Sequence, residues 1–282
     1  MLNGIVLLNK PRGISSNSAV NIVKKCAKAD KAGHLGTLDV AGEGLLPVTL
    51  GKCTKLFDFF LNKDKVYETV FEFGWTTDTL DLEGELTNKN EVIVTKDTLE
   101  NVCKDFVCTF DQMPPQYSAK KIGGRKAYDL AREGKIAELK PKTITIYGIK
   151  VLEELDKNVF KLSVHCSSGT YIRSLCRDIA EKLSTYGVMR CILRTKCGNF
   201  CILDSYTLNQ VREGNFKIIS ADQVFNYDSI NINKQQKEKL CNGINIRIDK
   251  KDGNYKFYDE NKVFVGVVNV QNNLCKFIYR NI

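Results

Sequence analysis

The stretch Gly33-His34-Leu35-Gly36-Thr37-Leu38-Asp39 is the most informative part of this sequence. Glycines on both sides of His34 let the backbone turn tightly and approach a ligand closely. Asp39 follows the apolar Leu38, and a carboxylate in a partly apolar cleft needs a partner that manages its charge. Asp39 is therefore a candidate catalytic residue. The plainer alternative is that Asp39 caps the next helix.

The residues on either side of this stretch alternate between strand and helix patterns. Residues 5–8 form a short apolar run that predicts a buried strand, and Ser15 or Ser16 can cap the helix that follows. The glycine-rich segment 33–51 predicts a structured loop that enters a helix. The alternating residues 67–73 predict another strand.

The middle of the chain continues this mixture of elements. Asp97 and Glu100 predict a capping box at the start of a helix, and residues 111–118, which include two prolines, predict a loop. Strand patterns occupy residues 143–146 and 159–166, and a helix is predicted to open at Ser167-Ser168-Gly169. Because strands and helices alternate irregularly, without regular βαβ spacing, we predict an α+β fold with a mixed sheet.

The composition turns polar near residues 228–235, and a different pattern follows. Short strand-like runs lie at residues 244–248, 255–258, 263–270 and 275–279. They predict a small β-barrel at the C-terminal end of the chain. We therefore expect two domains, residues 1–228 and residues 231–282.

Basic residues are distributed unevenly along the 282 residues, whose net charge is +9. Residues 113–142 hold eight basic and three acidic residues, and residues 231–282 hold ten basic and five acidic residues. Each block therefore carries +5, and the rest of the chain carries −1. Two basic blocks beside a nearly neutral body predict a footprint for phosphates. A basic surface that serves only solubility is the plainer alternative.

The eleven cysteines do not indicate disulfides or a metal site. The apolar run at residues 5–8 is too short for a signal peptide, and no run reaches membrane-spanning length. We therefore expect a cytoplasmic protein with reduced thiols. Cys191, Cys197 and Cys201 cluster, but their spacings fit no zinc pattern, and the chain has only two histidines. We expect no metal.

Five blocks of residues, in order along the chain, resemble the motifs of the TruB family of pseudouridine synthases. They are Leu8-Asn9-Lys10-Pro11-x-Gly13-x-Ser15-Ser16; Gly33–Asp39 with Gly44-x-Leu46-Pro47 and Gly51-x-x-Thr54-Lys55; Lys65-x-Tyr67 with Phe73-Gly74-x-x-Thr77-Asp78-Thr79-x-Asp81-x-x-Gly84; Pro114-Pro115-x-Tyr117-Ser118-Ala119-x-Lys121 with Gly124-Arg125-x-Ala127-Tyr128; and Ser168-Gly169-Thr170-Tyr171-Ile172-Arg173-Ser174-Leu175. Any one block alone carries little weight, but five in family order are specific. The chain departs from the family at Val40, where Pro is usual.

The resemblance implies a pseudouridine-synthase core with a mixed, largely antiparallel sheet, followed by a PUA-like RNA-binding barrel. A structural end-cap is the alternative for that barrel. The implied reaction isomerises a uridine in the T arm of transfer RNA, at position 55, after the base is flipped out of its stack. In this assignment Asp39 is the essential carboxylate, and Arg173 keeps it ionised and oriented. Tyr67 stacks on the target base or accepts the proton from C5.

The resemblance also assigns RNA contacts. His34 would fill the space that the flipped base leaves, whereas a satisfied histidine with no function is the alternative. Lys10, Lys55 and Lys121 are expected to contact phosphates or to serve the fold. The reaction is redox-neutral, so no cofactor is expected, and we expect a monomer that needs no protein partner and no membrane. Two competing functions are a pseudouridine synthase of another RNA and a non-catalytic protein that binds RNA or folds transfer RNA.

Overall fold

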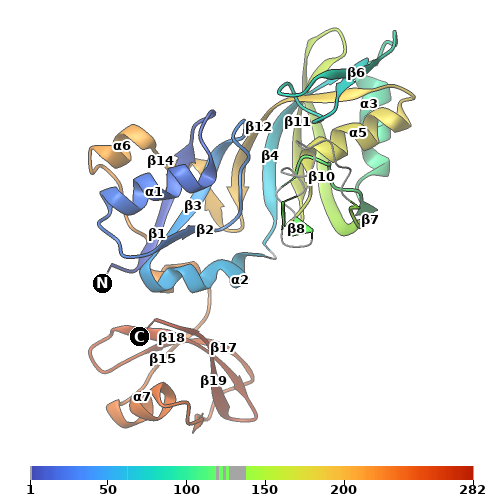
Figure 1. Ribbon diagram of the computed structural model, residues 1–282. Coiled ribbons are helices and arrows are strands. Elements are labelled where there is room, and N and C mark those ends of the chain that lie inside the picture. The colour runs from blue at the N-terminus through green and yellow to red at the C-terminus, as the bar shows by residue number, and fades with distance from the viewer. Residues whose placement is uncertain (1, 62, 119–120, 123–124, 127–137, 282) are drawn as a thin grey trace.

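A ten-stranded mixed sheet forms the body of the protein in the computed structural model, which describes residues 2–61, 63–118, 121–122, 125–126 and 138–281 (Figure 1). Its strands, in spatial order, are β14 (Tyr206–Thr207), β1 (Gly4–Lys10), β3 (Glu43–Leu50), β12 (Gly187–Cys197), β4 (Lys65–Phe73), β11 (Val159–Cys166), β10 (Lys142–Asp156) and β7 (Thr109–Gln112), with β2 (Ala32–His34) on β3 and β13 (Phe200–Cys201) on β12. Most neighbouring pairs are antiparallel, and β1–β14 and β3–β12 are parallel. The predicted α+β class with a mixed, largely antiparallel sheet is confirmed.

Helices pack on the sheets, and short elements connect the strands. The helices are α1 (Ser16–Cys26), α2 (Phe57–Leu61), α3 (Lys96–Asp105), α5 (Ile172–Lys182), α6 (Leu208–Arg212) and α7 (Lys234–Cys241), with 3-10 turns η1 (Gly51–Leu56), η2 (Ile202–Asp204) and η3 (Ala221–Val224). Two small hairpins pair β5 (Trp75–Thr77) with β6 (Leu86–Lys89) and β8 (Lys121–Ile122) with β9 (Arg125–Lys126). Apolar residues of α1, α3, α5 and α6 join one core cluster with β1, β4 and β11.

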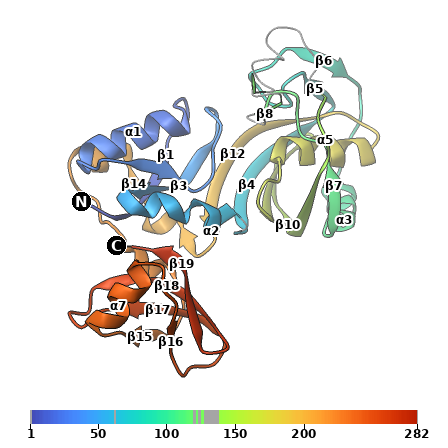
Figure 2. The same cartoon turned by 60° about the horizontal axis from the view of Figure 1, so that its bottom comes forward.

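Strand β12 holds the two halves of the sheet together. It pairs in parallel with β3 at Leu193 and Arg194 and runs antiparallel to β4 along most of its length. Figures 1 and 2 show one half around α1, β1 and β3, and the other around β4, β10 and α5, with β12 running from one to the other. The catalytic candidates therefore come from both sides of one strand.

Four local expectations are wrong. Helix α5 begins at Ile172, after the N-cap Tyr171, and not at residues 167–169. Segment 33–51 is not a loop that enters a helix, because residues 43–50 form the buried central strand β3. The cap of α3 is Thr95 with Thr98, whose side chains and backbone amides bond reciprocally, and not Asp97 with Glu100. Residues 111–112 belong to strand β7, and the predicted loop begins only after them. The helix capped by Ser15 and the strand at residues 159–166 are confirmed.

The C-terminal part is a second sheet, in the order β15 (Ser229–Asn231), β17 (Gly253–Tyr258), β18 (Phe264–Gln271), β19 (Leu274–Arg280) and β16 (Ile246–Arg247). The small β unit expected from the sequence is confirmed, as a half-barrel with α7 beside it (Figure 2). Its boundary at residues 228–231 stays a prediction about domains. Within the described part of the chain, no helix is both long and apolar enough to cross a membrane.

The two sheets share a hydrophobic core. Side chains of β1 alternate, so Val6 and Leu8 pack under α1 while Ile5 and Leu7 pack on the opposite face. That opposite face is covered by η1, α2 and the second sheet, which contributes Phe264, Val267 and Tyr279 to the cluster. A hydroxyl from the second sheet, Oη of Tyr258, lies 2.9 Å from the carboxylate of Asp222. The second sheet is therefore packed against the first by apolar contacts and a polar one.

Candidate active site

A cavity of about 570 Å³ opens beside β12 and collects the main predicted site residues. Asp39 reaches it from the loop between β2 and β3, Tyr67 from β4, and Arg173 from the first turn of α5. His34, at the end of β2, also lines its wall. The volume falls in the range typical of small-molecule sites, so a single nucleotide base can enter it.

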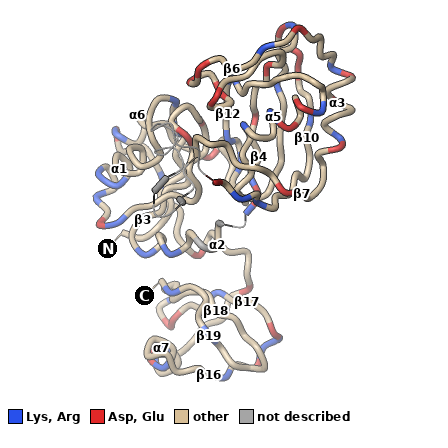
Figure 3. The backbone as a smooth tube through the Cα atoms, turned by 45° about the vertical axis from the view of Figure 1, so that its right-hand side comes forward, with Lys and Arg blue, Asp and Glu red and all other residues tan. Residues whose placement is uncertain are grey.

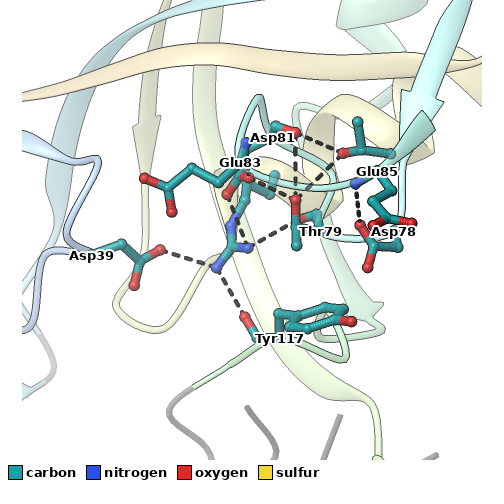
Figure 4. Close-up of polar contacts among 9 residues, drawn as sticks. Asp39, Asp78, Thr79, Asp81, Glu83, Glu85 and Tyr117 are labelled. Carbon is teal, nitrogen blue, oxygen red and sulfur yellow. Dashed lines mark hydrogen bonds and ion pairs between the residues drawn. The ribbon is translucent and has the colours of Figure 1, made fainter. Parts of the chain in front are cut away.

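Arg173 is the electrostatic centre of this cavity. Its side chain is only 9% exposed, and one terminal nitrogen, Nη2, donates to Oδ2 of Asp39 at 3.0 Å. The other, Nη1, lies 3.2 Å from Oδ2 of Asp81, which is 12% exposed. The same two nitrogens also donate to the carbonyls of Thr79 and Tyr117, as Figure 4 shows around the labelled Asp39. Arg173 is thus held on three sides and orients Asp39, whose own side chain is 59% exposed and faces the cavity.

The loop that carries Asp39 is clamped at each position around it. The buried hydroxyl of Ser16 donates to the carbonyl of Leu38 and accepts from its amide, at 2.7 and 2.9 Å. After Asp39, the carbonyl of Val40 accepts from the amide of Gly13 at 2.9 Å. These bonds fix the backbone although Val40 replaces the usual Pro. Strand β3, and not a helix, follows, so Asp39 is not a helix cap.

Tyr67 is buried and points into the cavity wall. Burial raises the pKa of Tyr67 to about 12, against the opposing effect of the Arg194 charge and of its hydrogen bond to the tyrosine. The phenol is therefore protonated at neutral pH. It can take a proton from a substrate only if it passes its own proton on, whereas its ring needs no such change to stack on a base.

His34 has a neutral ring in this environment. Burial lowers the pKa of His34, and the positive charge of Arg194 lowers it further. Its Nδ1 is buried and has no hydrogen-bond partner among the residues that the structure describes. A buried polar atom without a partner is uncommon, and here it belongs to a residue that lines the cavity.

The three predicted lysines occupy different environments. Lys10 is fully buried, and its ammonium donates to the carbonyls of Pro11, Ile14 and Val40, so its contacts are structural ones. Lys55 is exposed on η1 and is not among the residues that line the cavity. The side chain of Lys121, in β8, lies outside the described residues. The structure therefore brings together Asp39, Tyr67, Arg173 and His34, but not Lys10 or Lys55.

Two residues that sequence reasoning did not single out belong to the site. Asp81 lies within the motif around Thr77–Asp81, and it pairs with Arg173 from the side opposite Asp39. Arg194, in β12, is 1% exposed and borders the cavity. The sequence gives little indication of its inward position, because register shifts in the β12–β4 ladder interrupt the alternation of inward and outward side chains.

No group of three or more histidine, cysteine or acidic side chains suited to a metal occurs in the part of the chain that the structure describes. What the cavity does offer is one exposed carboxylate oriented by a buried cation, beside an aromatic ring and a neutral imidazole. This arrangement suits attack on, or proton removal from, an electron-poor ribose or base.

Comparison with known proteins connects this cavity to one family. Residues 24–172 match the model of the TruB family pseudouridylate synthase (N terminal domain). A protein named tRNA pseudouridine synthase B from Clostridium novyi is 40% identical over 278 residues, covering 94% of this chain and 95% of its own length. Its namesakes from Clostridium acetobutylicum and Caldanaerobacter subterraneus subsp. tengcongensis are 37% and 35% identical, covering 98% and 94% of this chain and 99% and 94% of their own lengths.

Solved structures agree in fold. An H/ACA RNP bound to a substrate RNA containing 2′-deoxyuridine gives a TM-score of 0.71 at 20% identity, covering 99% of this chain and 85% of that one. A Cbf5-Nop10-Gar1 complex gives 0.70 at 21% identity, with the same coverage. At this identity the likeness concerns the fold alone. The family match over more than half of the sequence, and full-length relatives above 30% identity, establish that this chain belongs to the TruB family of pseudouridylate synthases.

Proposed function

We propose that this chain isomerises uridine to pseudouridine in transfer RNA, at position 55 of the T arm, with Asp39 as the essential carboxylate. The observation that carries the proposal is the Arg173–Asp39 pair, in which a buried guanidinium aims an exposed carboxylate into a base-sized cavity. The names of the full-length relatives, tRNA pseudouridine synthase B, support transfer RNA as the substrate.

The reaction makes few chemical demands on the protein. The bond from C1′ of the ribose to N1 of uracil breaks, the base turns, and C1′ joins C5; the hydrogen on C5 leaves, and N1 takes up a proton. No electrons are gained or lost overall, so no redox cofactor is required. Asp39 attacks C1′ or the base, or removes the 2′ proton. In each case it acts from the position that Arg173 and the clamped loop give it.

The base must leave its stack to reach Asp39, at a cost of roughly a few kcal/mol. Tyr67 supplies an aromatic face in the wall of the cavity, on which an extruded uracil can stack. The ring of His34 lines the same cavity and can fill space that the extruded base leaves in the RNA. These two side chains offer the RNA partial compensation for the stacking energy that it gives up.

Phosphate contacts require positive charge around the cavity. Besides the two basic blocks of the sequence, α1 and the turn after it carry Lys24, Lys25, Lys28 and Lys31 against one acid, Asp30, and Figure 3 shows basic positions in blue along α1. The turn at Lys31 bonds through its carbonyl to Gly51, at the start of the η1 turn that carries Lys55. We place RNA on these surfaces and expect the protein to act in the cytoplasm as a monomer.

The test uses a transfer RNA transcript labelled with tritium at C5 of uracil, since joining C5 to ribose releases that hydrogen to water. The wild type should release tritium from the T-arm uridine, and a transcript with cytidine at position 55 should release none. Asp39→Asn should abolish release and leave RNA binding nearly intact, because it removes only one of the many charges that the RNA meets. Mapping of pseudouridine in the product identifies the position.

Asp78→Asn is the matched control. Asp78 lies in the loop that carries Asp81, where its carboxylate accepts from the amide of Glu85 at 2.9 Å, and asparagine keeps this acceptor. Wild-type release is expected from this variant. Turnover by a purified Asp39→Asn protein would refute the role of Asp39, and pseudouridine only at other positions or in other RNAs would refute the substrate.

A further inference from the structure

Arg194 is a fully buried cation that is held by backbone carbonyls. Its Nε donates to the carbonyl of Leu45 at 2.7 Å, Nη2 to that of Gly36 at 3.0 Å, and Nη1 to that of Thr37 at 3.4 Å. Each of its three nitrogens thus reaches a carbonyl. Two of these carbonyls lie in the loop immediately before Asp39.

No acid among the described side chains balances the charge of Arg194. Among the residues whose side chains the structure describes, no carboxylate lies within 4.0 Å of Arg194. Burial of an unpaired cation opposes folding, because water solvates the charge better than the interior does. A residue kept in this state is poorly explained by fold stability alone, since an apolar side chain of similar volume would avoid the cost.

Arg194 also lies where three parts of the site meet. In the sheet it faces Gly44 of β3 on one side and Tyr67 of β4 on the other. A Cβ on Gly44, whose φ is +99°, would come within 2.4 Å of the Arg194 carbonyl, so glycine allows β3 to approach β12 at this point. Arg194 therefore contacts the Asp39 loop, β3 and the strand of Tyr67 together.

We propose that Arg194 is a positioning residue for the isomerisation: it ties the Gly36 and Thr37 carbonyls to the strand of Tyr67 and so fixes Asp39 relative to a base stacked on that ring. The inference rests on the proposed function, because it concerns that reaction. Catalytic groups must lie within a fraction of an ångström of their productive positions. Ser16, the first residue of α1, and Gly13, in the turn before it, hold Leu38 and Val40, whereas Arg194 connects the loop to β4.

The first experiment compares Arg194→Met and Arg194→Lys with the wild type in single-turnover isomerisation at saturating transfer RNA. Arg194→Met should slow the step by roughly 100-fold, the effect of a misplacement of about 1 Å. Arg194→Lys keeps the charge but reaches fewer carbonyls, so its rate should lie roughly tenfold below that of the wild type. The dissociation constant of the RNA should stay unchanged, because Arg194 is buried away from the surface.

Arg190→Met is the matched control, since it removes an arginine from the same strand. Arg190 is half-exposed and pairs with Glu72 on the surface at 3.4 Å. This variant should isomerise uridine at the wild-type rate. A rate loss as large as that of Arg194→Met would mean that any arginine removed from β12 has the same effect, and it would overturn the proposal.

A second readout needs no RNA. The charge of Arg194 contributes to the lowered pKa of His34, and His165 is the only other histidine of the chain. NMR titration should therefore find a higher pKa for His34 in Arg194→Met and a value near the wild type in Arg194→Lys. The His34 pKa tests whether the charge of Arg194 lies beside the loop, and it does so independently of any catalytic activity.

The outcomes separate the two proposals. If the wild type makes no pseudouridine, the proposed function fails, and an unchanged His34 pKa in Arg194→Met would then overturn the placement of Arg194 as well. If the wild type is active, a folded Arg194→Met or Arg194→Lys protein that reacts at the wild-type rate overturns the positioning role, even where its melting temperature falls. If Arg194→Met does not fold, Arg194→Lys decides alone.

Discussion

Replacement of Arg173 by Met should lower the free energy of unfolding by about 3 kcal/mol, besides abolishing activity. Loss of one partner from a buried ion pair costs about 3–5 kcal/mol. The lower end applies, because Oδ1 of Asp81 keeps its bonds from the Thr79 hydroxyl and the Glu83 amide, at 2.7 and 3.0 Å. Only Oδ2 of Asp81 would lose its partner. The pair with Asp39 adds ~0–1 kcal/mol, since Asp39 is 59% exposed.

A second substitution tests the source of this loss. Asp81→Asn in the Arg173→Met background removes the unpaired buried charge and should recover about 1–2 kcal/mol, because a neutral amide leaves a smaller desolvation penalty. Activity should stay absent, because Asp39 still lacks the guanidinium that orients it. Stability therefore depends on the Asp81 side of Arg173, and catalysis on the Asp39 side.

Urea unfolding at pH 7 measures both effects. Lys182→Met is the control, since Lys182 is on the same helix and its ion pair with Asp105 is more than half exposed on both sides, so its removal should cost less than about 1 kcal/mol. A loss below about 1 kcal/mol for Arg173→Met would refute the reasoning. A double variant less stable than Arg173→Met alone would refute it too.

Three further predictions concern pH, RNA and metals. The pKa of His34 is lowered in the folded protein, so the unfolded chain binds its proton first as the pH falls below about 6.5, and the free energy of unfolding should fall there. His34→Gln should show a smaller fall between pH 7.5 and pH 5.5, measured by urea unfolding at each pH. An equal fall in the wild type and the variant would contradict this. Lys250 and Lys251 are exposed and belong to the basic block at residues 231–282. Replacement of both by Gln should reduce the slope of log affinity for transfer RNA against log salt concentration by roughly 0.7–0.9 for each phosphate that the protein no longer neutralises. An unchanged slope and affinity would show that these lysines do not contact the RNA. Activity should survive chelator treatment and dialysis, and a loss that zinc restores would contradict this.

The strand around Tyr67 was predictable, because alternation over residues 67–73 is the period of a half-buried strand. Strand β3 was not predictable, since Gly44 and Pro47 suggest a loop. Its burial on both faces leaves only an apolar run in the sequence, without the alternation that marks a strand. A cap that uses Thr95 in place of Asp97 differs by two residues, which is within the ordinary uncertainty of helix ends.

Asp39 and Arg173 were identified by their motifs, but their contact joins residues 134 positions apart and depends on the whole sheet. Asp81 stood within a family motif without a role, because a carboxylate in a turn is more often a local cap than a buried ion-pair partner. The carbonyl partners of Arg194 could not be predicted either, since every residue type has a backbone carbonyl and the sequence does not mark which ones accept.

The alternation of side chains in β1 has a consequence for how the molecule comes apart. Ile5 and Leu7 pack in the cluster that also holds Val267 and Tyr279 of the second sheet, while their neighbours Val6 and Leu8 belong to the core under α1. Neither sheet can melt without uncovering apolar surface of the other, so heating should produce a single calorimetric transition, with equal calorimetric and van't Hoff enthalpies. The short connection at Asp228, whose carbonyl accepts from the amide of Lys256, therefore joins two parts of one cooperative unit rather than two domains that fold independently.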